Sequence, residues 1–216
     1  MDAQTLLQLL QDGGLTVYPL GVGSVIVVSI VIERWWRFRG IEESTRALTH
    51  STVDALVARD VETAKTLCEK AGTSVGDIYL EAMRWKNIQL EDLERVMATS
   101  RQEAVSGLGR GVWLIGTIGS LAPYVGLFGT VVGIIRAFQD MAEHGAGGFE
   151  VVAAGISEAL VATAAGLFVA IMALFFFNIL QVRTTAISKT YARSCERFIQ
   201  ALLYVESSEG DTGTEA

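Results

Sequence analysis

The segment LAPYVGLFGTVVGII, residues 121–135, decides the fold of this 216-residue chain. It contains no charged side chain, so it is apolar enough to lie in lipid. It also contains one proline, three glycines and one threonine, which a helix that only faces lipid could do without. The segment therefore predicts a membrane helix with one face suited to close packing or to polar chemistry.

Two further blocks of the chain are as apolar as this one. A helix needs about 20 mostly apolar residues to cross the hydrocarbon core of a bilayer. The blocks 15–32, 111–135 and 151–180 have about this length, and the only charged residue in them is Glu158. We therefore predict an all-α integral membrane protein with three transmembrane helices.

The first block, 15–32, could instead be the apolar part of a cleaved signal peptide. A signal peptide has a basic segment before its apolar part, and no Lys or Arg precedes this block. Glu33, Arg34 and two tryptophans follow it at once. We favour a membrane anchor that is retained.

Basic residues predict the orientation. Region 33–110 holds 12 of the 17 Lys and Arg, the chain after Leu180 holds four, and segment 136–150 holds one. Because Lys and Arg concentrate in cytoplasmic loops, we expect 33–110 and the C-terminus in the cytoplasm. The expected order is an outer N-terminal segment 1–14, helix 15–32, a cytoplasmic helical region 33–110, helix 111–135, an outer loop 136–150, helix 151–180, a cytoplasmic helical extension 181–205 and a disordered acidic tail 206–216.

Two short motifs in the cytoplasmic region predict helix starts. Ser51-Thr-Val-Asp54 and Ser74-Val-Gly-Asp77 both have the form of a capping box, in which a hydroxyl and an acidic side chain bond free backbone N–H groups.

Small residues gather on one face of each of the last two membrane helices. At about 100° per residue, six residues of each block, most of them Gly or Ala, fall within one narrow arc. The arc of 111–135 holds Gly116, Gly119, Pro123, Gly126, Thr130 and Gly133, and that of 151–180 holds Gly155, Ala159, Ala162, Gly166, Ala170 and Ala173. Such faces let helix backbones approach closely, so helix packing explains most of them.

Packing alone does not explain Glu158. A carboxylate near the middle of a membrane costs about 2.5 to 3.5 kcal/mol, so it normally faces a partner or a water-filled path. Glu158 is also only seven residues from the start of its block, so it could reach the outer surface instead. The roles of Thr130 and Thr163 have two interpretations as well, because a membrane threonine either lines a polar path or forms a hydrogen bond with its own helix.

No motif for catalysis, metal binding or cofactor binding accompanies these helices. The glycine-rich segment 126–133 lacks the Lys-Ser/Thr ending of a phosphate-binding loop. Cys68 and Cys195 form no metal-ligand spacing, and we expect them to be reduced structural thiols. We therefore expect no enzymatic activity, no metal and no cofactor, and no nucleic-acid partner.

Two segments resemble the signatures of the MotA/TolQ/ExbB proton-channel family. APYVGLFGTVVGIIRAF, residues 122–138, resembles the second-helix signature, and GISEALVATAAGLFVAIMALFFFN, residues 155–178, resembles the third. The expected order of segments is similar to that of the ExbB/TolQ branch, whereas MotA itself is larger and has four membrane helices.

The resemblance implies a homopentameric ring in the bacterial inner membrane, with the second and third helices lining a pore. The pore would hold two copies of an ExbD/TolR-like single-helix protein, whose membrane aspartate takes up and releases protons. Thr130 and Thr163 match the threonines beside that aspartate, and Glu158 matches an acidic position near the outer end of the third helix. Pro123 and Asn178 also match family positions.

The function implied is that of a stator subunit, which uses the proton-motive force to move a periplasm-spanning protein of the TonB/TolA type or a gliding effector. Two other classes stay open. One is a scaffold that assembles membrane proteins without conducting, and the other is an ion channel that needs no partner.

Overall fold

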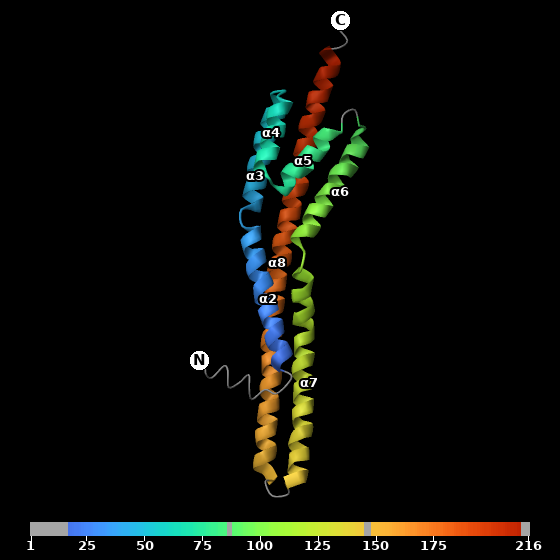
Figure 1. The fold of residues 1–216 in the computed structure, drawn as a ribbon. Helices are drawn as coiled ribbons and strands as arrows, with labels where there is room; N and C mark the ends of the chain where they lie inside the picture. The colour runs from blue at the N-terminus through green and yellow to red at the C-terminus, as the bar shows by residue number, and fades with distance from the viewer. Residues whose placement is uncertain (1–16, 86–87, 145–147, 213–216) are drawn as a thin grey trace. The chain divides into compact units, whose positions relative to one another are not determined.

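The computed structural model describes residues 17–85, 88–144 and 148–212, and within these ranges its regular secondary structure is helical. The prediction of an all-α protein is thereby confirmed. The helices are α2 (Val17–Phe38), α3 (Ile41–Val57), α4 (Val61–Ala71), α5 (Ser74–Arg84), α6 (Leu90–Leu108), α7 (Val112–His144) and α8 (Gly148–Thr212), as Figure 1 shows.

Helices α2, α7 and α8 each contain a stretch long and apolar enough to cross a membrane. The three predicted apolar blocks coincide with these stretches, so the prediction of three candidate membrane spans is confirmed. The expected outer segment 1–14 lies outside the described residues.

Two helices continue beyond the ends predicted for them. Helix α7 extends to His144 and α8 begins at Gly148, so most of the expected loop 136–150 is helical. Helix α8 also continues to Thr212, into the tail 206–216 that we expected to be disordered. Both expectations were wrong for a common reason: once a helix exists, each added residue gains a backbone hydrogen bond, so polar residues extend it until a strong breaker intervenes.

The two predicted caps have different outcomes. Helix α5 begins at Ser74, as expected, but its N-cap is the preceding residue, Thr73, whose Oγ1 accepts the Gly76 N–H at 3.2 Å. The motif at Ser51 is not a helix start, because it lies inside α3, where the Ser51 hydroxyl donates to the carbonyl of Ala47 at 3.1 Å. A four-residue motif does not distinguish a first turn from a later one.

The chain forms two compact units. The first comprises the chain up to Trp35 together with Gly111–Leu180, and the second comprises Trp36–Arg110 together with the chain from Gln181 onward. The first unit therefore holds the apolar stretches, and the second holds α3 to α6 and the later part of α8.

An aromatic stack lies in the core of the second unit. The rings of Tyr79, on α5, and Phe198, on α8, are parallel with their centroids 4.1 Å apart, and both side chains are fully buried. The Tyr79 hydroxyl is 2.8 Å from Oγ1 of Thr49 on α3, so this polar atom has a partner inside the core. The extension 181–205 thus contributes core residues to this unit.

Both cysteines are buried in the same core. The Cys68 thiol lies 3.6 Å from Oγ1 of Thr52. Burial raises the pKa of Cys68, and it raises the pKa of Cys195 to about 11. Because the thiolate is the reactive form, burial and the raised pKa both disfavour reaction of these thiols in the folded chain.

We expect the two thiols to react with Ellman's reagent about 100-fold more slowly in the folded chain at pH 8 than in the denatured chain, because reaction requires opening of the core. The folded pKa values exceed the unfolded ones, so folding favours the protonated thiols. For Cys195, this contribution to the unfolding free energy is complete below the unfolded thiol pKa of about 8.5 and is lost as pH rises through about 11. Reaction of both thiols at the denatured rate, with the circular dichroism still helical, would contradict the buried placement.

Candidate functional site

Helices α7 and α8 of the first unit contact each other through their small residues, and Figure 1 shows them side by side. Along the contact, Gly116 faces Phe177, Gly119 faces Leu174 and Ala173, Gly126 faces Gly166, Gly133 faces Ala159 and Ala137 faces Gly155. Positions fall along α8 as they rise along α7, so the two helices are antiparallel. The small faces of one chain therefore lie against each other.

The backbones come closest at Gly126 and Gly166. A Cβ added at Gly166 would lie 2.6 Å from the Ala122 carbonyl oxygen and 3.0 Å from the Gly126 Cα. A Cβ added at Gly126 would lie 2.9 Å from the Ala162 carbonyl oxygen. These distances are too short for a carbon atom, so only glycine fits at either position without displacing the helices.

This approach brings Thr163 within reach of the other helix. Because Gly126 has no side chain, its carbonyl is accessible, and the Thr163 hydroxyl donates to it at 2.9 Å across 37 residues of chain. Oγ1 of Thr163 lies 3.4 Å from Oγ1 of Thr130, and the Thr130 hydroxyl donates to the Leu127 carbonyl at 2.7 Å. The structure thus brings Thr130 and Thr163 together.

The hydrogen bonds define what the two hydroxyls can do. Each threonine hydroxyl carries one hydrogen and two lone pairs. Both hydroxyls donate to backbone carbonyls, and the Thr163 hydroxyl is also placed to donate to Oγ1 of Thr130, which occupies one lone pair of Thr130. The remaining lone pairs can accept a hydrogen bond from an acid placed beside them. Neither group carries a charge, so the pair can guide a proton but cannot hold one.

The other predicted site residues lie apart from this pair. Glu158 is exposed, although its neighbour Ala159 is buried against Gly133. Asn178 is also exposed. Pro123 is half-buried inside α7, where the missing N–H leaves one carbonyl of the preceding turn without its helical partner.

Sequence reasoning missed the Gly126 carbonyl as a functional group. The face of small residues on block 111–135 predicted that another helix backbone comes close. It did not show which helix supplies that backbone or in which register the two helices pack. Among the residues that the structure describes, no group of three or more His, Cys, Asp and Glu side chains is placed to hold a metal ion.

Residues 70–193 match the model of the MotA/TolQ/ExbB proton channel family. The matched range is more than half of the chain and includes Thr130, Glu158 and Thr163. It also includes the whole contact between α7 and α8 described above.

Three relatives show similarity over different lengths. A biopolymer transport protein of the ExbB-like kind from Synechocystis is 32% identical over 173 residues, which are 78% of this chain and 67% of that protein. The biopolymer transport protein ExbB of Pseudomonas putida is 32% identical over 209 residues, or 91% of this chain and 60% of the relative. The Tol-Pal system protein TolQ of Haemophilus influenzae is 39% identical over 108 residues, or 50% and 47%. The matched part of this chain thus spans about half to two thirds of the length of these relatives.

The close approach of α7 and α8 can be tested with glycine variants. We expect Gly166→Ala to lower the free energy of unfolding by about 1 to 3 kcal/mol, because the new methyl group displaces the Ala122 carbonyl. Gly21→Ala is the matched control: no atom lies within 4 Å of its added Cβ, and we expect no loss or a gain of up to about 1 kcal/mol. Unfolding in mixed detergent micelles measures both. Equal stabilities of Gly166→Ala and the wild type would contradict the contact.

Proposed function

Because the chain belongs to the MotA/TolQ/ExbB proton channel family, we propose that it is the stator subunit of a proton-driven motor in the bacterial inner membrane. The similarity to proteins named ExbB and TolQ supports the ExbB/TolQ branch. The three apolar helices support a multi-pass membrane protein. The task of the motor would be transport across the envelope, envelope maintenance or gliding.

The observation that carries this proposal is the pair formed by Thr130 and Thr163 at the α7–α8 contact. Two hydroxyls from opposite helices lie 3.4 Å apart inside an otherwise apolar and small-residue contact. Helix packing alone needs only the glycines and alanines there. The hydroxyls add hydrogen-bonding capacity at a depth where lipid offers none.

The titrating group of the proposed proton path belongs to another protein. Apart from Glu158, the predicted membrane blocks of this chain have no charged residue. A membrane aspartate on an ExbD/TolR-like single-helix partner would supply the acid, with the threonine hydroxyls accepting its hydrogen bond. Each proton that crosses 100 mV releases about 2.3 kcal/mol, so a few protons suffice for a conformational step.

The assembly would be a homopentamer around two partner helices, with Glu158 toward the outer end of the path. The bulky faces of α7 and α8 support assembly: Phe128 is 62% exposed and Phe168 is 66% exposed in the single chain. In a membrane, such side chains contact lipid or a neighbouring subunit. The basic residues of 33–110 support a cytoplasmic second unit, a cytoplasmic C-terminus and a periplasmic N-terminus. The powered protein would be of the TonB/TolA type or a gliding effector.

A non-conducting scaffold is the second candidate function. The observation that favours it is that the hydroxyls of Thr130 and Thr163 already donate within the chain. In that case the threonines serve only to join the helices.

Proton flux into liposomes separates the two candidates. With the partner present, we expect Thr163→Val to reduce flux at least 100-fold, because valine keeps the shape of threonine but removes its hydroxyl; one lost catalytic hydrogen-bonding group typically costs about 10² to 10³ in rate. Thr117→Val is the control, because Thr117 lies on α7, is exposed and bonds only the carbonyl of Trp113 on its own helix. The control should keep wild-type flux.

The scaffold function makes the opposite prediction. If the wild-type complex carries no flux, and Thr130, Thr163 and Glu158 can all be replaced without loss of activity in cells, the motor function is wrong. Co-purification of the partner with each variant shows whether assembly is intact.

The chain reconstituted without a partner tests whether it is a channel by itself. We expect its proton conductance to stay within about twofold of that of empty liposomes, because no acid lies beside the two hydroxyls and an uncharged hydroxyl does not hold a proton. Fluorescence of an entrapped pH dye under an imposed potential measures this. A conductance equal to that of the full complex would show a self-sufficient channel instead.

A further inference from the structure

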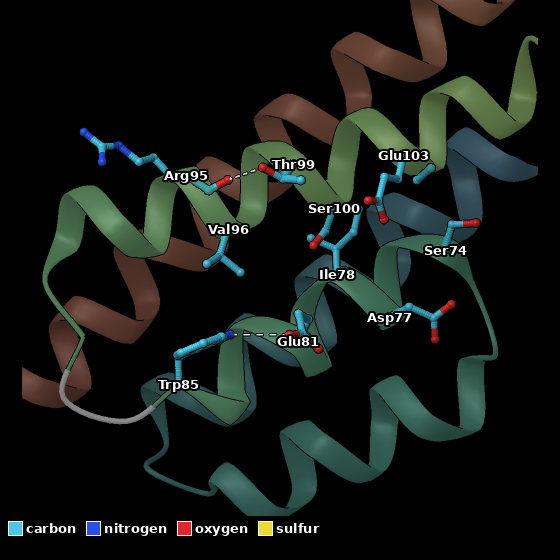
Figure 2. Close-up of a pocket in the computed structure, with 11 residues that line it drawn as sticks. Ser74, Asp77, Ile78, Glu81, Trp85, Arg95, Val96, Thr99, Ser100 and Glu103 are labelled. Carbon is cyan, nitrogen blue, oxygen red and sulfur yellow. Dashed lines mark hydrogen bonds between the residues drawn. The ribbon is translucent and has the colours of Figure 1, made fainter.

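A groove of about 750 Å³ lies between α5 and α6 in the second unit (Figure 2). The predicted proton path does not use it, and of its lining residues only Ile78 is a buried core residue. Its lining residues are Ser74, Asp77, Ile78, Glu81, Trp85, Arg95, Val96, Thr99, Ser100, Glu103 and Ala104. The groove is large enough to hold several side chains of a bound segment.

The lining of the groove combines apolar and polar side chains. Val96 and Ala104 from α6 are half-buried and supply its apolar part together with Ile78 from α5, which is buried in the core. Trp85, just after α5, is 51% exposed, and its indole N–H donates to Glu81 Oε1 at 3.4 Å. A fixed, half-exposed indole is a typical anchor for the apolar residues of a binding partner.

The charges of the groove are mainly negative. Asp77 on α5 and Glu103 on α6 carry this charge, whereas the Glu81 carboxylate is already paired with Arg84 at 3.1 Å. The one basic lining residue, Arg95, points away from Asp77 and Glu103 in Figure 2, and its guanidinium lies 3.7 Å from Asp92. The groove therefore favours a ligand that is positively charged along its edges and apolar at its centre.

We propose that this groove binds the short cytoplasmic segment of the single-helix partner, an inference that rests on the proposed function. A protein with one membrane helix and a periplasmic domain exposes a short flank to the cytoplasm, and such flanks are rich in Lys and Arg. The negative charge of the groove complements the positive charge of such a flank, which is why we propose this segment as the ligand. The acidic end of this chain does not fit, because residues 206–216 contain Glu and Asp but neither Lys nor Arg.

The groove is also close along the chain to the second membrane block. Ala104 lies seven residues before Gly111, and seven residues of extended chain span at most about 25 Å.

Photo-crosslinking in the purified full complex tests the proposal. A benzoylphenylalanine at position 99, in the groove, should crosslink to partner residues that precede its membrane helix, and mass spectrometry identifies the linked peptide. The matched control is the same group at position 66, because Thr66 is an exposed helical threonine outside the groove. Position 66 should give no such product.

Charge reversal provides the second measurement. With benzoylphenylalanine at position 99, Asp77→Lys combined with Glu103→Lys should lower the yield of the partner crosslink at least fivefold, because both substitutions repel a basic segment. Glu94→Lys is the control, since Glu94 is exposed on α6 but does not line the groove. It should leave the yield unchanged.

The outcomes separate this proposal from the proposed function. If the partner co-purifies and protons flow, but position 99 links only to a second copy of this chain or to nothing, the groove proposal is wrong while the motor function stands. A partner crosslink that the double reversal leaves unchanged also overturns the groove proposal. If no partner co-purifies with the wild-type chain, the proposed function itself fails.

Discussion

The contact between the backbones of α7 and α8 at Gly126 and Gly166 is the constraint on which the first unit depends. In a membrane, an apolar side chain gains little free energy when it moves from lipid into a helix–helix contact, because both surroundings are apolar. Helices therefore associate through close packing and hydrogen bonds. Glycine at both positions removes the side chains that would hold the backbones apart, with 2.6 Å between a hypothetical Cβ and the facing carbonyl oxygen. The hydrogen bond from Thr163 to Gly126 depends on this approach.

The same contact relates structure to the proposed mechanism. The paired helices present two hydroxyls at a defined place and expose bulky side chains such as Phe128 and Phe168 on their other faces. Two uncharged hydroxyls in this position can accept a hydrogen bond from an acid of the proposed partner without binding its proton. The second unit is stabilised differently, by a core of large buried side chains around Tyr79 and Phe198.

The sequence predicted those features that depend on local pattern. The length of the nearly uncharged blocks predicted the three apolar helices. The positions of Gly and Ala around each helix axis predicted the faces of small residues on α7 and α8. The sequence did not show that the two faces meet in one chain, because helix register is set by packing between distant residues such as Gly126 and Gly166. It also missed the groove, which depends on how α5 and α6 pack. The helix ends at His144 and Thr212 were missed because polar residues permit a helix as readily as a loop.

A structure of the complex in lipid, determined with its single-helix partner, tests the central claim most directly. The measured quantity is the distance from the partner's membrane carboxylate to the hydroxyl oxygens of Thr130 and Thr163. The account predicts that, in at least one subunit, the carboxylate lies within direct or single-water hydrogen-bonding distance of one of these oxygens. A structure in which both threonines contact only hydrocarbon or their own helices, with the carboxylate elsewhere in every subunit, would contradict it.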